Sequence, residues 1–166
     1  MLKYIGQSGC IPYSLAKMTF TEAEMTANKY GPAAGDEEKW QSELTEEQFH
    51  VLRQKGTEAP FTGKYNDFHQ KGLFLCAACG NALFASDDKY DSGSGWPSFT
   101  KPVNSENIAT NRDFSHNMVR TEAVCAKCGS HLGHVFDDGP EPLAQRWCIN
   151  SVALEFEQKD GSGPKE

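Results

Sequence analysis

The clearest local pattern of polar and apolar residues predicts one short helix over residues 46–55. Thr45 and Gln48 have the spacing of a capping box, in which the Thr45 hydroxyl accepts a hydrogen bond from the Gln48 amide. Leu44 and Phe49 occupy the flanking apolar positions that fix the entry of the chain into the helix. We expect Gly56 to end the helix in a left-handed conformation.

Beyond the helix the pattern changes to short apolar segments separated by clusters of Gly, Asp, Asn and Ser, which is typical of strands and turns. The clearest predicted strand is 147–156, where Cys148, Asn150, Val152, Leu154 and Phe156 alternate and would share one face. No helical crossovers separate the strands, so the sheets should be antiparallel. The other strand segments are marked by Phe74, Phe84, Phe99, Val103, Val119, Val124, Val135 and Phe136.

Composition divides the chain into three parts. Residues 1–36 are expected to be a flexible N-terminal segment ending in the linker-like stretch 31–35, residues 37–158 a single folded domain, and residues 159–166 a disordered tail. The 166 residues include 38% hydrophobic and 23% charged residues, which is typical of a soluble globular protein. We expect a mainly β domain with short N-terminal helices.

Charge and hydropathy exclude some functions. No stretch approaches the roughly 18 consecutive apolar residues of a membrane-spanning helix. The net charge of −7 argues against binding to duplex nucleic acid or to a phospholipid surface, both of which need clustered cations. The N-terminus carries no secretory signal pattern, so we expect a cytoplasmic protein with reduced thiols, with organelle targeting by the N-terminal segment left open.

Four of the six cysteines form two Cys-x-x-Cys-Gly stretches, at 76–80 and 125–129. Two such pairs can supply the four thiolates of a closed tetrahedral metal site, and zinc suits that ligand set best, with iron second. The alternative is four ordinary buried or redox cysteines. A site without an open position stabilises the fold and does no chemistry, so we expect one structural zinc ion. Its ligands would be Cys76, Cys79, Cys125 and Cys128.

The candidate chemistry lies in Cys148 and three other segments of the chain. A cysteine on a strand is most often a small buried hydrophobe, but Asn150 follows at strand spacing, and His131 and His134 come directly after the second cysteine pair. Trp96 lies in a Gly-rich turn, although it could equally belong to the core. A thiol, imidazoles, an amide and an aromatic wall are the parts of a thiol-based redox site. Spacing alone does not show that they meet.

The chain closely resembles the type-B methionine sulfoxide reductases, also called methionine-R-sulfoxide reductases. The matching stretches run in family order from about residue 40 to 156. They are GTEAPFTGKY at 56–65, CAACG at 76–80, DSGSGWPSF at 91–99, CAKCG at 125–129, HLGHVFDDGP at 131–140 and RWCINS at 146–151.

The resemblance implies two antiparallel sheets with a zinc-binding four-cysteine site, and a peptide-methionine (R)-S-oxide reductase that repairs oxidised proteins. It implies that Cys148 attacks the sulfoxide sulfur and becomes a sulfenic acid. His134 would protonate the leaving oxygen because an imidazole titrates near the working pH, with Asn150 as a further catalytic residue. Trp96 and His131 would bind substrate, with Trp96 as the wall for the methyl group.

One position departs from the family pattern. Many members carry a second cysteine where this chain has Ser94, and that cysteine resolves the sulfenic acid as a disulfide. Cys10 is then a candidate resolving thiol, with thioredoxin or another thiol as the reductant. The expected substrates are oxidised proteins or free methionine-R-sulfoxide, and the expected state is a monomer.

Two other classes of protein fit parts of the pattern. A zinc-stabilised β module that binds a protein partner would keep the cysteine pairs but would have no need of Cys148, His134, Trp96 and Asn150. A nucleic-acid zinc ribbon is opposed by the charge of −7.

Overall fold

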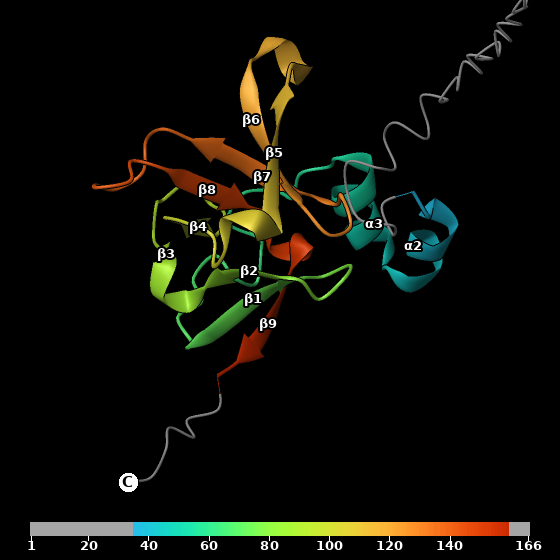
Figure 1. The fold of residues 1–166 in the computed structure, drawn as a ribbon, viewed down its shortest axis with the longest axis horizontal. Coiled ribbons are helices and arrows are strands. Elements are labelled where there is room, and N and C mark those ends of the chain that lie inside the picture. Colours follow the sequence, from blue (N-terminus) through green and yellow to red (C-terminus); the bar gives the residue numbers. More distant parts are fainter. Residues whose placement is uncertain (1–34, 160–166) are drawn as a thin grey trace, which may run out of the picture.

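The computed structural model describes residues 35–159, which form two helices followed by nine strands (Figure 1). All paired strands are antiparallel and belong to two sheets, which confirms the predicted mainly β class. The helices are α2 (Glu37–Glu43) and α3 (Glu46–Gln54). The three-stranded sheet has the order β2–β1–β9, with β1 (Gly72–Cys76), β2 (Ala82–Ala85) and β9 (Leu154–Gln158). The six-stranded sheet has the order β3–β4–β8–β7–β6–β5, with β3 (Lys89–Tyr90), β4 (Ser98–Phe99), β5 (Ile108–Asp113), β6 (Arg120–Cys125), β7 (His131–Phe136) and β8 (Arg146–Ile149).

Helix α3 begins as the capping box predicts. The Gln48 amide donates to the Thr45 hydroxyl at 3.2 Å, and the Thr45 amide donates to the Gln48 side chain at 3.1 Å. The expected left-handed end is displaced by one residue, because Lys55 has a φ of 57° and Gly56 does not need one. A Cβ at Gly56 would lie 2.4 Å from the ring of the exposed His50, so that side chain would have to move to make room for it.

The single strand predicted over 147–156 is wrong. The chain leaves β8 after Ile149, makes a short 3-10 turn at Ser151–Ala153, and enters β9 in the other sheet. The turn forms because the carboxylate of Glu58 accepts the amides of Ser151 and Val152. The side chains beyond Asn150 therefore belong to a different part of the molecule from Cys148. Val103 and Val119 also lie outside strands and are exposed.

The core lies between the two sheets and is rich in aromatic rings. Phe84 of β2 stacks on Phe99 of β4 with ring centroids 4.3 Å apart, and Phe74 of β1 meets Phe99 edge-on at 5.1 Å. Trp147 of β8 packs against Phe84 at 6.1 Å. Such pairs add directional preference to the burial of apolar area. The inner face of β8 is thereby fixed, which leaves its outer face to carry the site.

Both helices lie on one side of the molecule (Figure 1). Helix α3 packs against β7 and the turn after β8, and α2 packs against α3. Arg53 of α3 forms an ion pair with Glu37 of α2 and donates to the carbonyl of Cys128 at 3.0 Å. The helices are therefore linked to the loop after β6. Within residues 35–159, no helix is long and apolar enough to cross a membrane.

Candidate functional site

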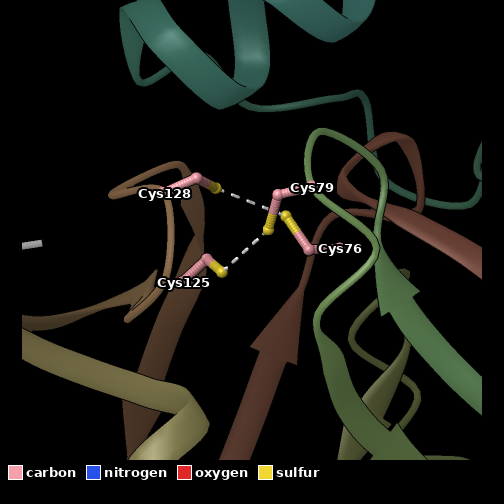
Figure 2. Close-up of side chains that lie close together, drawn as sticks. All are labelled: Cys76, Cys79, Cys125 and Cys128. Atoms are coloured by element: carbon pink, nitrogen blue, oxygen red, sulfur yellow. Dashed lines mark hydrogen bonds between the residues drawn. The ribbon is translucent and has the colours of Figure 1, made fainter. Parts of the chain in front are cut away.

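The four cysteines of the two Cys-x-x-Cys pairs meet in a single cluster (Figure 2). The sulfur atoms of Cys76 and Cys128 are 3.7 Å apart, those of Cys79 and Cys125 are 3.6 Å apart, and all four lie within 4.8 Å of one another. A tetrahedral ion with metal–sulfur bonds of about 2.3 Å needs sulfur atoms ~3.8 Å apart. The cluster therefore fits one metal ion with four thiolate ligands.

The two pairs have the same backbone geometry. In each, the amide of the glycine after the second cysteine donates to the carbonyl of the first cysteine at 2.8 Å, and the glycine takes a positive φ, 69° at Gly80 and 70° at Gly129. The amide of each first cysteine donates to the carbonyl five residues on, from Cys76 to Asn81 and from Cys125 to Ser130. Two matching loops thus present their thiols to one point.

The cluster also anchors the segment that carries Cys148. The Ala77 amide, inside the first loop, donates at 3.0 Å to the carbonyl of Ala153, in the turn after β8. Through this bond, the position of the first loop is linked to the turn that follows the candidate nucleophile.

Cys148 lies in the middle of β8, between two neighbouring strands. Its direct partners in the sheet are His134 of β7 and Ser98 of β4. Because directly opposite residues point to the same face of a sheet, the Cys148 thiol and the His134 imidazole lie side by side. The strands approach closely here, since a Cβ on Gly133 would lie 2.0 Å from the Cys148 carbonyl oxygen.

A pocket of about 110 Å³ opens over this pair of side chains. It brings together Cys148, His134, Trp96 and Asn150, which spacing in the sequence could not place in contact. Its full lining is Thr57, Trp96, Arg120, Gly133, His134, Phe136, Cys148 and Asn150.

A carboxylate holds the His134 ring. His134 Nε2 lies 2.8 Å from Asp113 Oδ2, and Arg120 Nη2 lies 2.8 Å from the same oxygen. The pKa of Asp113 is well below its usual range, because it accepts the Ser115 amide, bonds to His134 and lies beside Arg120. Asp113 is therefore ionised and can only accept a hydrogen bond. Nε2 of His134 must then carry the donated proton, which leaves Nδ1 as the ring nitrogen that can take up or release a proton.

Burial shifts the pKa values of the thiol and the imidazole in opposite directions. It raises the pKa of Cys148, and the nearby Arg146 guanidinium and Ser94 hydroxyl offset this only in part. It lowers the pKa of His134 despite the bond to Asp113. At neutral pH the resting pair is therefore a neutral thiol beside a neutral imidazole, with one proton to transfer.

Glu58 organises the opposite wall of the pocket. Its carbonyl accepts the Trp96 indole N–H at 3.1 Å, and its amide donates to Asn150 Oδ1 at 3.1 Å. Its carboxylate accepts the Ser151 and Val152 amides at 2.7 and 3.0 Å. Asn150 Nδ2 donates to a backbone carbonyl of β7 at 3.0 Å. The Asn150 amide is thus held at both ends by backbone groups.

His131 lies behind His134 rather than in the lining of the pocket. It is 3% exposed, and its ring meets that of His134 edge-on with centroids 5.4 Å apart. His131 Nδ1 bonds to Glu122 Oε1 at 2.8 Å, and Lys55 binds the other Glu122 oxygen at 3.0 Å. Burial alone would raise the pKa of Glu122, but these two bonds lower it to about 2. His131 therefore supports the inner side of His134.

Ser94 lies at the edge of the site, with its hydroxyl 4.0 Å from the Cys148 sulfur. Its hydroxyl bonds to Ser92 at 2.8 Å, and Ser92 bonds to Ser98 at 2.7 Å. In many family members a resolving cysteine occupies this position. Here the position is adjacent to the Cys148 thiol and carries a hydroxyl. Cys10 lies outside the described residues.

Three residues of the site were not predicted from the sequence: Glu58, Asp113 and Arg120. Glu58 stands in a stretch that matches the family, but its contacts reach residues more than 30 positions away. Asp113 and Arg120 flank the polar turn 115–117, and that turn was the only local signal that they could pair across a hairpin.

Comparisons with known proteins identify the family of the chain. The SelR domain model matches residues 44–158. A protein of Hahella chejuensis is 53% identical over 130 residues, covering 78% of this chain and 94% of that protein. A protein of Methanosarcina mazei is 55% identical over 130 residues, covering 78% and 93%, and one of Bradyrhizobium diazoefficiens is 56% identical over 123 residues, covering 74% and 88%. All three are named peptide methionine sulfoxide reductase MsrB. With these matches over most of its length, the chain belongs to the SelR-domain family of methionine sulfoxide reductases.

Proposed function

We propose that this chain reduces methionine-R-sulfoxide, in proteins or free, to methionine with Cys148 as the nucleophile, and so repairs oxidised proteins. The observation that carries the proposal is the pairing of Cys148 with His134 across β8 and β7 at a pocket of about 110 Å³. That volume is below the roughly 300 Å³ of small-molecule sites, so it suits one side chain.

The chemistry balances with one thiol and one sulfoxide. Cys148 Sγ attacks the sulfoxide sulfur and forms a sulfur–sulfur bond with it. The oxygen then passes from the substrate sulfur to Sγ, so that its bond to the substrate sulfur and the sulfur–sulfur bond both break and methionine leaves. The cysteine is oxidised by two electrons to a sulfenic acid, and the sulfoxide is reduced by the same two. The thiol proton ends on the transferred oxygen, so no other reactant enters this half of the cycle.

His134 moves that proton. The sulfoxide oxygen must be protonated as its bond to sulfur breaks, and the resting pair holds one proton on Cys148. His134 Nδ1 accepts it from the thiol and returns it to the oxygen, while Nε2–H stays bonded to Asp113. Asp113 is a positioning residue, since it holds the ring in one tautomer and stabilises the transient imidazolium.

Trp96 and Asn150 shape the pocket. The Trp96 indole is fixed by the Glu58 carbonyl and offers an apolar wall to the methyl group of the substrate. One epimer then places its methyl group on this wall and its oxygen near His134, whereas the other epimer reverses the two. Asn150 holds the adjoining backbone, and His131 supports the ring of His134 from behind.

The metal ion of the four-cysteine cluster is zinc, held as a structural ion. Four soft thiolates at tetrahedral spacing suit zinc, and the ligand set leaves no open position for a reactant. When bound, the ion cross-links the two loops and takes no part in the reaction.

An external thiol recycles Cys148. A hydroxyl at Ser94 cannot form a disulfide, and the other cysteines among residues 35–159 are the four of the cluster. Thioredoxin or another thiol therefore reduces the sulfenic acid directly, or reduces a disulfide between Cys148 and Cys10 if the N-terminal segment brings that thiol to the site.

The test is an assay with separated epimers and dithiothreitol as the reductant. We expect the chain to consume the R epimer and not the S epimer. The Cys148→Ser variant should lose turnover, because a hydroxyl is a far weaker nucleophile at neutral pH, whereas the matched Cys10→Ser control should keep it. Equal consumption of both epimers, or appreciable turnover by Cys148→Ser, would overturn the proposal.

A further inference from the structure

Glu58 uses all of its hydrogen-bonding groups, although it does not line the catalytic pocket. The residue is 7% exposed, and each oxygen of its carboxylate accepts one backbone amide, from Ser151 at 2.7 Å and from Val152 at 3.0 Å. Its own amide donates to the side chain of Asn150, and its carbonyl accepts the indole N–H of Trp96. Two side chains of the pocket lining are thus held by one residue outside it.

The carboxylate ties Glu58 to the strand that carries Cys148. Ser151 and Val152 lie in the short turn that follows β8, and Cys148 lies in β8 itself. Hydrogen bonds from amides to a carboxylate are stronger than those between neutral groups, because the acceptor is charged. The backbone of Glu58 therefore keeps a fixed place relative to the thiol.

The loop after Glu58 packs tightly on its carboxylate. A Cβ on Gly63 would lie 2.6 Å from Glu58 Oε1 and 2.2 Å from Ser151 Oγ, so the glycine backbone lies against both side chains. The Ser151 hydroxyl also accepts the Tyr65 amide at 3.2 Å. A substitution at Gly63 can therefore displace the carboxylate without changing its charge.

The Trp96 ring takes its orientation from Glu58. The backbone next to Trp96 is held by β8, because the Ile149 amide donates to the Pro97 carbonyl at 3.0 Å. That bond does not fix the side-chain torsions of Trp96. The indole N–H is the only polar group of the ring, and its acceptor is the Glu58 carbonyl at 3.1 Å. The direction of the ring therefore depends on where that carbonyl lies.

We propose that Glu58 is a positioning residue that sets how strictly the pocket selects the methyl group of methionine-R-sulfoxide. This inference rests on the proposed function, in which Trp96 is the wall for that methyl group. The carboxylate fixes the Glu58 backbone to the turn after β8, and the Glu58 carbonyl fixes the indole. The distance from the wall to the Cys148 thiol is therefore set through this residue. In a pocket of about 110 Å³, a small displacement of one wall changes the room beside the reacting sulfur.

The size of the alkyl group on the sulfoxide reports the position of the wall. One extra methylene in an apolar pocket typically changes kcat/KM by about 10- to 200-fold. Ethionine-R-sulfoxide, which carries an ethyl group in place of the methyl group, should therefore be a poorer substrate of the wild-type chain. The methyl-to-ethyl ratio of kcat/KM measures this selectivity. The ratio does not depend on the folded fraction of the enzyme, because the same active molecules turn over both substrates.

The experiment measures this ratio in Glu58→Gln and in Gly63→Ala, with dithiothreitol as the reductant. Glutamine has one acceptor oxygen in place of two, so it can hold only one of the two amides. We expect both variants to lower the methyl-to-ethyl ratio about tenfold, because the displaced wall leaves room for the extra methylene. The kcat for methionine-R-sulfoxide should stay close to that of the wild type, since the pairing of β7 with β8 still holds Cys148 beside His134.

The matched control is Thr62→Val, in the same loop. It removes the bond from the Thr62 hydroxyl to the Ala59 carbonyl, which is not among the bonds that hold the wall, so the ratio should not change. A double-mutant cycle tests the route of the effect. Adding Glu58→Gln to Trp96→Ala should not lower the ratio further, because no indole is left to displace.

Two results would overturn the inference. An unchanged ratio in folded Glu58→Gln and Gly63→Ala would give Glu58 a structural role alone. If circular dichroism shows that Glu58→Gln does not fold, Gly63→Ala and Glu58→Asp, which keeps the charge on a shorter side chain, decide the question. An equal fall of the ratio in the Trp96→Ala background would show that Glu58 does not act through the wall. Both results leave the proposed function intact, whereas a wild-type chain that turns over neither substrate overturns the proposed function first.

Discussion

In the proposed reaction, two residues with opposed pKa shifts, Cys148 and His134, start the chemistry. Burial holds the thiol of Cys148 and the imidazole of His134 in their neutral forms, so the pair keeps one proton across the neutral range. Gaining a second proton requires a pH below the usual range of histidine, because the pKa of His134 is lowered. Losing the proton requires a pH above the usual range of cysteine, because the pKa of Cys148 is raised. We expect a broad plateau of kcat/KM between those limits.

Asp113→Asn tests the role of the carboxylate that holds the His134 ring. The bond to Asp113 opposes the lowering of the His134 pKa by burial, while Arg120 and His131 add to the lowering. Removing the negative charge should move the acid limb of the pH profile of kcat/KM to lower pH and reduce kcat by about 10²-fold, since the ring becomes a weaker base.

The matched control for that substitution is Asp87→Asn, which removes an exposed carboxylate paired with Lys71. It should leave both the pH profile and kcat unchanged. If the acid limb of the pH profile of kcat/KM is unshifted in Asp113→Asn, the carboxylate has only a structural role.

Among single residues, the sequence predicted those that stand in stretches resembling the family. Cys148, His134, Trp96 and Asn150 stand in characteristic stretches, and all four line the pocket. Asp113 and Glu58 could not be identified, because an aspartate or glutamate in a loop is common and only a partner far along the chain gives it a function. Cys10 stays a prediction, since it lies outside the described residues.

The pairing of β7 with β8 is the element that places the thiol beside the imidazole. Gly133 permits the close approach of these strands, because an added Cβ would lie 2.0 Å from the Cys148 carbonyl oxygen and 3.0 Å from the Ile149 Cα. The spacing of the two strands is therefore part of the proposed catalytic geometry.

Gly133→Ala should push the strands apart. Overpacking of this kind costs about 1–3 kcal/mol of unfolding free energy, and a displacement of ~1 Å at a reacting group lowers the rate by about 10²-fold. Urea unfolding and kcat with dithiothreitol measure the two effects. Gly35→Ala is the control, since a Cβ there meets nothing within 4 Å. Full kcat in Gly133→Ala would contradict the importance of this spacing.

Elements were predictable where their signals are local. Helix α3 starts at Glu46, as expected, because its capping box involves residues three positions apart. The strand predicted over 147–156 was wrong, because its interruption depends on Glu58, some ninety positions earlier in the chain. The alternation of side chains that predicted the strand continues across the break, so it does not reveal the interruption.

At the scale of the whole molecule, the four-cysteine cluster joins the two sheets. Cys76 ends a strand of the three-stranded sheet, and Cys125 ends a strand of the six-stranded one. A metal ion held by the cluster would therefore link the sheets at the side where α3 packs. The two antiparallel sheets were expected, but their strand order depends on contacts between distant segments, which local patterns do not encode.

Cys125→Ser should release the metal and unfold the domain. A structural zinc site of this kind supplies about 10 kcal/mol or more, comparable with the roughly 5–15 kcal/mol that stabilises a whole domain. Metal content by mass spectrometry and near-ultraviolet circular dichroism measure the outcome, with Cys148→Ser as the control that keeps both. A chain that contains no stoichiometric metal and keeps its fold in a strong chelator would contradict the structural site.

A single turnover without reductant tests whether Cys148 takes the oxygen from methionine-R-sulfoxide. The Cys10→Ser chain is mixed with excess R epimer, the methionine formed is counted, and the oxidation state of each cysteine is mapped by mass spectrometry after trapping of sulfenic acids. We expect one methionine per chain and one oxygen atom on Cys148. The absence of methionine, or oxygen on another cysteine with Cys148 unmodified, would contradict it.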